Sequence, residues 1–131
     1  MRQEVRLAGF GGQGIILAGY IVGKAAALYG GREAIFTQAY GPEARGGACS
    51  AELVLDDVPI DYALVTTPSI LVLMSQEAYE KFGTEVEPPA SVLIESDLVY
   101  YDTAMEYAPS REALQSAMKG IQMGTKGLVG R

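Results

Sequence analysis

Six residues near the N-terminus constrain the fold of this chain more than any other stretch: Gly9, Phe10, Gly11, Gly12, Gln13 and Gly14. They follow a short apolar segment, residues 5–8, that is typical of a strand. They open a long apolar segment, residues 13–29, that is typical of a helix. A glycine-rich turn of this kind presents bare N–H groups at a helix N-terminus, where the helix dipole favours an anion such as a phosphate. The pattern therefore predicts a βα unit with a turn suited to an anionic ligand.

Each glycine of this turn has an expected role. Gly9 suits a tight turn, Gly11 and Gly12 permit close approach of a ligand to the backbone, and Gly14 lets the helix pack near the strand. Dinucleotide-binding turns are usually followed, about 20 residues later, by an acidic residue at the end of the next strand. The next strand, expected at residues 34–38, ends without one. The turn is therefore expected to serve packing or another anionic ligand, and a nicotinamide dinucleotide is not supported.

Composition limits the classes of protein that this chain can belong to. Its 131 residues suit a single domain, residues 1–131, and a net charge of −6 gives no electrostatic support to a nucleic-acid partner. With one cysteine and no histidine, the chain alone makes neither a disulfide framework nor a Cys/His zinc or iron–sulfur site. No metal ligands and no catalytic residues are therefore assigned.

The apolar run at residues 15–28 is short for a membrane span and contains Gly19, Gly23 and Lys24. We expect a buried helix there and no membrane partner, and the two glycines are expected to allow close packing on a sheet. The first residues lack the basic-then-apolar pattern of a signal peptide, so a cytoplasmic, reducing location is the default expectation. Cys49 is interpreted as a buried packing thiol, with a reactive thiol as the alternative.

Strand and helix signals alternate along the rest of the chain. Strands are expected at residues 34–38, 49–55, 70–74 and 91–94, with weaker strand signals at residues 58–60, 62–66 and 98–101. A short helix is expected between Ser75 as N-cap and Gly83, and another at residues 110–119. The predicted fold class is α/β: a Rossmann-like, mostly parallel sheet with an antiparallel excursion around residues 56–57 and helices on both faces.

A second informative stretch, residues 39–47, follows the second expected strand at the same carboxyl edge of the sheet as the glycine turn. Glu43 and Arg45 place one carboxylate and one guanidinium on a loop of otherwise small residues, and Gly46 and Gly47 allow a positive-φ path. One interpretation is a surface turn with an internal Glu–Arg pair. The other is an arginine fork presented to a phosphate, a carboxylate or a partner subunit.

Three segments in order resemble a known family: GFGGQGI at residues 9–15, YGPEARGGAC at residues 40–49 and SQEAYEKF at residues 75–82. They resemble the gamma subunit of 2-oxoacid:ferredoxin oxidoreductases, and the middle segment looks more like the 2-oxoglutarate type than the indolepyruvate type. The resemblance covers roughly residues 3–101. Beyond it the chain looks shortened, since residue 107 runs almost directly into what resembles the family's last helix; a short variant and a missing segment are both open.

The resemblance implies a non-redox component, inactive alone, of an enzyme that oxidatively decarboxylates a 2-oxoacid to an acyl-coenzyme A. Thiamine diphosphate, Mg²⁺ and iron–sulfur clusters would lie in partner subunits, named alpha, beta and a ferredoxin-like delta, with ferredoxin as an indirect partner. The sequence agrees, because it has no CxxC spacing and no Gly-Asp-Gly pattern. The isolated chain could also form a homodimer. An exposed apolar surface for docking is expected around Tyr100 and Tyr101.

The resemblance also implies that coenzyme A enters at a cleft between subunits. Its phosphates would meet the N–H groups of residues 11–14, and Arg45 would add charge. The binding residues expected on this basis are Gly9, Gly11, Gly12, Gln13, Gly14, Glu43, Arg45, Gly46 and Gly47. The alternative function is a stand-alone nucleotide- or anion-binding Rossmann-like module.

Overall fold

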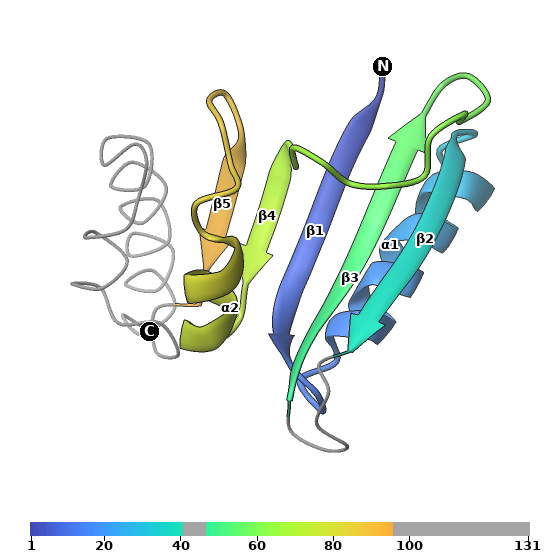
Figure 1. Cartoon of the computed structure of the whole chain (residues 1–131). Coiled ribbons are helices and arrows are strands. Elements are labelled where there is room, and N and C mark those ends of the chain that lie inside the picture. The colour runs from blue at the N-terminus through green and yellow to red at the C-terminus, as the bar shows by residue number, and fades with distance from the viewer. Residues whose placement is uncertain (41–46, 96–131) are drawn as a thin grey trace, which may run out of the picture.

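A computed structural model describes residues 1–40 and 47–95, which form a five-stranded sheet with a helix on each face (Figure 1). The strands are β1 (Gln3–Phe10), β2 (Glu33–Tyr40), β3 (Ala48–Asp56), β4 (Ile70–Leu73) and β5 (Ser91–Ile94), and the helices are α1 (Ile15–Leu28) and α2 (Gln76–Phe82). The strand expected at residues 98–101 and the helix expected at residues 110–119 lie outside the described residues. Within them, no helix is long and apolar enough to cross a membrane.

The sheet order is β2-β3-β1-β4-β5. β1 pairs in parallel with β4 and β4 with β5, whereas β3 lies antiparallel between β1 and β2. β3 is therefore antiparallel to the other four strands, which all run in the same direction. The prediction of an α/β sheet with an antiparallel excursion and helices on both faces is confirmed.

The excursion is β3 itself, and the return strands expected at residues 58–60 and 62–66 are wrong. Both edges of β3 are already paired, one with β1 and the other with β2, so no free edge is left for a returning strand. The chain instead runs from β3 past β1 to β4 as an irregular connection (Figure 1).

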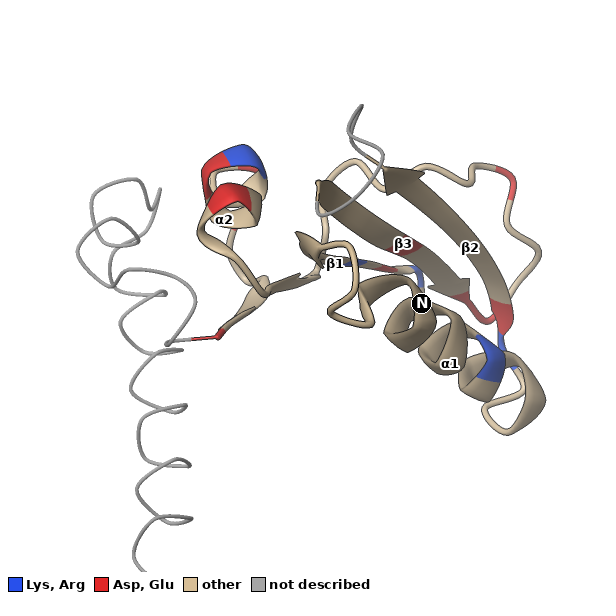
Figure 2. Cartoon of the chain, turned by 90° about the horizontal axis from the view of Figure 1, so that it is seen from below, with Lys and Arg blue, Asp and Glu red and all other residues tan. Residues whose placement is uncertain are grey.

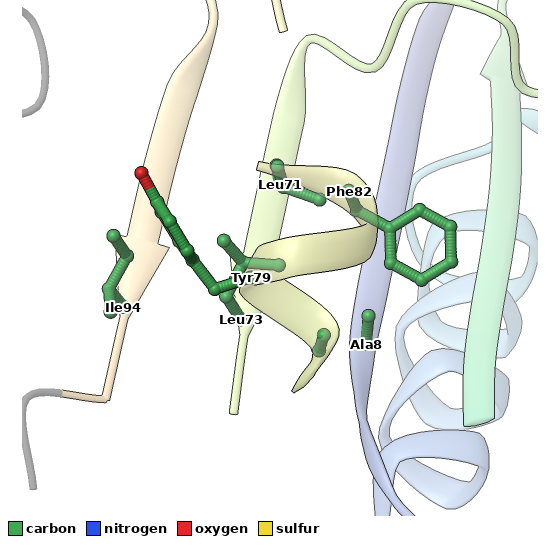
Figure 3. Packing of buried hydrophobic residues seen from close by; sticks show 7 residues of the cluster. Ala8, Leu71, Leu73, Tyr79, Phe82 and Ile94 are labelled. Atoms are coloured by element: carbon green, nitrogen blue, oxygen red, sulfur yellow. The ribbon is translucent and has the colours of Figure 1, made fainter. Parts of the chain in front are cut away.

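The core on the α2 face joins this short helix to three strands (Figure 3). Phe82 lies over β1, and Tyr79 extends toward Ile94 of β5. Ser75 caps the helix, because its hydroxyl accepts a hydrogen bond from the N–H of Ala78 at 3.1 Å. The helix signals around this segment are therefore confirmed, including its end before Gly83.

The core on the opposite face is built by the close approach of α1 to β3. A Cβ on Gly19 would lie 2.5 Å from the Ala51 Cβ, and one on Gly23 would lie 2.7 Å from Leu53 Cδ2. The predicted packing role of these two glycines is confirmed, because a Cβ at either position would lie closer to the sheet than normal packing allows.

The expectation that α1 is a buried helix is wrong. It buries only Ile15 and the two glycines, Gly19 and Gly23. The helix contacts the sheet along one narrow stripe, and within the described residues nothing covers its outer side. The prediction was wrong because a high apolar content is shared by helices that are buried on all sides and by helices that are buried along a single stripe.

Glu4 on β1 fixes the connection between β3 and β4. Its carboxylate accepts hydrogen bonds from the N–H groups of Thr66 at 2.7 Å and Thr67 at 3.0 Å, and it pairs with Arg2 at 2.9 Å. Burial alone would raise the pKa of Glu4, but these N–H groups and the Arg2 guanidinium together lower that pKa below its usual value.

We expect Gly19→Ala to lower the free energy of unfolding by about 1–3 kcal/mol, because the Ala51 Cβ cannot rotate away. Gly23→Ala is the matched control on the same helix. There the contact is the end of the flexible Leu53 side chain, and alanine favours a helix over glycine by ~0.5–1 kcal/mol. Urea unfolding measures both variants, and equal stabilities would contradict the close contact at Gly19.

We expect Glu4→Gln to lower the free energy of unfolding at pH 7 by about 1.5 kcal/mol, which is the typical contribution of a hydrogen bond to a charged group. Since the folded-state pKa is lowered, the contribution of the carboxylate is complete above the unfolded pKa of ~4.3 and is lost as the pH falls through the folded value. The difference between wild type and variant, measured by urea unfolding, should therefore narrow below pH 4. A constant difference down to pH 3 would show that the charge of Glu4 is not what stabilises the loop.

Candidate functional site

The glycine turn and the loop after β2 begin at the same edge of the sheet. β1 ends opposite Ala48 and β2 ends opposite Cys49, so both strands reach the start of β3 together. The N–H of Gly11 donates to the carbonyl oxygen of Gly47 at 3.0 Å, which joins the turn directly to the end of the loop. The expectation that both stretches share the carboxyl edge is confirmed for these residues. Glu43, Arg45 and Gly46 lie outside the described part of the chain.

Two glycines of the turn have a backbone conformation that other residues rarely adopt. Gly12 has φ +92° and Gly14 has φ +82°, both in the left-handed region. Gly9 instead belongs to β1, and its role is space: a Cβ there would lie 2.3 Å from Gln13 Oε1 and 3.0 Å from the Met74 Cβ.

The side chain of Gln13 holds the turn in place. Its Oε1 accepts a hydrogen bond from the N–H of Phe10 at 2.7 Å, and its Nε2 donates to the carbonyl oxygen of Met74 at 2.9 Å. One amide thus ties the end of β1 to the residue after β4. The glycine pattern predicted a role for Gln13 through its backbone alone, because a contact 61 residues along the chain leaves no local signal.

Two of the four N–H groups expected to face an anion are engaged within the protein. Gly11 donates to Gly47, and the N–H of Gln13 donates to the Phe10 carbonyl at 3.2 Å. Within the described residues, the N–H groups of Gly12 and Gly14 have no protein acceptor. Gly14 is the N-cap of α1 and brings no side-chain cap, so the N–H groups of the first helical turn are also open. The site for an anion therefore narrows to Gly12, Gly14 and the start of α1.

A pocket of about 570 Å³ adjoins these open N–H groups on the α1 face of the sheet. Its lining residues come from the turn, α1 and the ends of β2 and β3: Gly11, Gly12, Gly14, Ile15, Ile16, Leu17, Tyr20, Phe36, Gln38, Tyr40 and Cys49. Tyr20 meets Phe36 edge to face, with ring centroids 6.2 Å apart. The volume is in the range of small-molecule sites, and the walls are mainly apolar.

The polar groups of this pocket are few and uncharged among the described residues. Gln38 lines it near the end of β2, where a dinucleotide-binding site would place a carboxylate. The hydroxyls of Tyr20 and Tyr40 and the glycine N–H groups supply the other hydrogen-bonding capacity. The pocket thus combines an apolar wall with an anion-favouring rim.

Cys49 lines the pocket from β3 as a free, buried thiol. Burial raises the pKa of this thiol, so it stays protonated at neutral pH and is a poor nucleophile. The interpretation of Cys49 as a packing residue is therefore favoured over the reactive alternative. Across residues 1–40 and 47–95, no cluster of three or more Cys, His, Asp or Glu side chains is placed to hold a metal ion.

The sequence matches a family model described as pyruvate ferredoxin/flavodoxin oxidoreductase over residues 4–125. The chain belongs to this family. It is 56% identical over 106 residues to a 2-oxoglutarate synthase subunit KorC of Methanocaldococcus jannaschii, covering 81% of this chain and 57% of that relative. It is 47% identical over 111 residues to the subunit of the same name in Methanothermobacter marburgensis, covering 85% and 60%. This chain therefore spans less than two thirds of the length of these relatives.

Solved structures agree with the family. The gamma subunit of a keto/oxoacid ferredoxin oxidoreductase from Geobacter sulfurreducens is similar with a TM-score of 0.66 and 41% identity, over 76% of this chain and 53% of that one. A 2-oxoglutarate:ferredoxin oxidoreductase from Magnetococcus marinus shares the fold with a TM-score of 0.67 at 22% identity, over 76% of this chain and 17% of that one. That structure holds 2-oxoglutarate, coenzyme A and succinyl-CoA.

We expect Gln13→Glu to lower the free energy of unfolding by about 1–3 kcal/mol. A carboxylate still accepts from the Phe10 N–H, but it faces the Met74 carbonyl without a proton to donate. Gln38→Glu, at an exposed position near the end of β2, is the control for the added charge. Thermal unfolding measures the loss, and a Gln13→Glu variant as stable as its control would show that the amide bridge is unimportant.

Proposed function

We propose that this chain is the non-redox, gamma-type component of a 2-oxoacid:ferredoxin oxidoreductase, of the 2-oxoglutarate type. The thiamine diphosphate, Mg²⁺ and iron–sulfur clusters of such an enzyme would lie in companion alpha, beta and ferredoxin-like delta subunits, which pass electrons to ferredoxin. The ligands available in this chain support cofactors in other subunits, because the described residues offer only one cysteine, Cys49, whose thiol is buried and protonated. Family membership supports the enzyme class, and the KorC relatives support the 2-oxoglutarate assignment.

Within that enzyme, we infer that the chain helps to bind coenzyme A, the acceptor of the acyl group. One observation carries this proposal: the unpaired N–H groups of Gly12 and Gly14 lie at the rim of the 570 Å³ pocket. Oriented N–H groups at a helix N-terminus suit the phosphates of coenzyme A, whereas the apolar walls suit its less polar parts. The Magnetococcus marinus structure, which shares the fold, also holds coenzyme A, and this is consistent with the proposal.

Arg45 and its neighbours complete the proposed site. The loop of residues 41–46 leaves β2 at Tyr40 and returns at Gly47, whose carbonyl holds the glycine turn. A guanidinium on so short a loop has the reach to share a phosphate with Gly12 and Gly14. Glu43 is expected to orient Arg45, with Gly46 and Gly47 shaping the loop.

The experiment is reconstitution of the enzyme from this chain and its companion subunits. The chain alone should show no 2-oxoglutarate- and coenzyme A-dependent reduction of a viologen dye, whereas the assembled enzyme should be active. Arg45→Ala should raise the KM for coenzyme A about tenfold or more, the effect of losing a charge-assisted hydrogen bond of ~1.5–3 kcal/mol.

The KM for 2-oxoglutarate serves as the internal control, because the substrate would react at the thiamine diphosphate of another subunit. If Arg45 only braces its own loop, Arg45→Ala would lower the melting temperature and leave the coenzyme A KM unchanged, which would contradict the shared site. Clear turnover by the purified chain alone would contradict the subunit assignment. Binding of a nucleotide by a chain that does not associate with companion subunits would favour the alternative of a stand-alone nucleotide- or anion-binding module.

A further inference from the structure

The outer side of α1 presents a row of large apolar side chains to solvent. Exposure reaches 61% at Leu17, 50% at Tyr20, 56% at Ile21, 43% at Val22 and 64% at Leu28. These five residues are called the outer face of α1 below. Figure 2 shows the helix almost free of charged residues along its length.

The spacing of the outer face is that of a helix prepared to pack against another element. Leu17, Ile21 and Leu28 repeat at intervals of four and seven residues, so they share one stripe. Side chains of this size and exposure present on the order of a few hundred Å² of apolar surface, about the size of the largest apolar patch on a typical monomer, and such patches are often functional.

Lys24 is the only charged residue between Ile15 and Leu28. Its Nζ lies 5.6 Å from the centroid of the Tyr20 ring, and within the described residues no carboxylate pairs with it. A partner that covers the outer face must therefore accommodate one lysine in apolar surroundings. The natural complement is an apolar surface that carries one carboxylate.

A second copy of this chain fits that requirement poorly. In a two-fold pair, α1 would face α1, and two lysines would enter an interface to which neither helix brings an acidic residue. A 14-residue helix is only ~21 Å long, so any partner that buries the ~800 Å² per side of a stable interface must also contact surface beyond α1.

The outer face is continuous with the pocket at the glycine turn. Leu17 and Tyr20 belong to both, since they line the pocket and remain half or more exposed. A chain seated on the outer face would therefore also form the missing wall of the pocket and shield it from water.

On these grounds, and resting on the function proposed above, we propose that the outer face of α1 is the docking surface for a companion subunit of the oxidoreductase. The companion brings an apolar surface with a carboxylate opposite Lys24. By covering Leu17 and Tyr20, it completes the walls of the coenzyme A pocket. Binding of the companion and closure of the pocket are then one event.

The test uses the full chain co-expressed with the neighbouring gene products that carry the thiamine diphosphate and iron–sulfur motifs. Ile21→Asp should weaken their association at least tenfold in a tag pull-down and in surface plasmon resonance. Val58→Asp is the matched control, because Val58 is 59% exposed on the connection after β3. Both isolated variants should keep the wild-type melting temperature, since neither side chain is buried.

Lys24 provides a second, independent readout. Lys24→Glu should weaken association several-fold, whereas Lys24→Arg should retain it, and the effect of Lys24→Glu should shrink at high salt. Normal assembly of Ile21→Asp would overturn the docking surface while leaving the proposed function intact. The docking surface would also be overturned if the isolated chain forms a dimer that Ile21→Asp dissociates while binding to the companion subunits is unchanged. Failure of the wild-type chain to assemble with these subunits would overturn both proposals.

Discussion

The close contact between α1 and β3 is the constraint on which the rest of the structure depends. Gly19 and Gly23 remove the side chains that would hold the helix away, so its axis lies close over the sheet. Because the contact stripe is narrow, the remaining surface of α1 stays outside the core. The N-terminus of the helix is thereby fixed at the carboxyl edge of β1, beside the end of β2 and the start of β3. The pocket, the open N–H groups and the outer face all follow from this placement.

The glycine turn divides its polar groups between structure and ligand. The backbone N–H groups of Gly11 and Gln13 donate hydrogen bonds to carbonyl oxygens of the protein. The side-chain amide of Gln13 links the end of β1 to the residue after β4. The N–H groups of Gly12 and Gly14, both at positive φ, have no protein acceptor among the described residues. Such a turn is rigid before a ligand arrives, which lowers the entropic cost of binding.

Much of the fold was predictable because its signals are local. The strand around Cys49, the Ser75 cap and the glycine turn each depend on neighbouring residues, and all three are present in the structure, although β3 is buried on both faces rather than on alternate residues. The return strands after Asp56 were wrong because strand pairing is decided by which edges are free, a property of the whole sheet. The exposure of α1 and the bridge from Gln13 to Met74 escaped prediction for the same reason, since both depend on distant residues.

The most direct test of this account is a structure of the assembled enzyme with coenzyme A bound. The account predicts phosphate oxygens within hydrogen-bonding distance of the Gly12 and Gly14 N–H groups, with Arg45 on the same ligand. It also predicts a companion subunit against Leu17 and Tyr20. Coenzyme A bound away from the glycine turn, with Gly12 and Gly14 facing water, would contradict it.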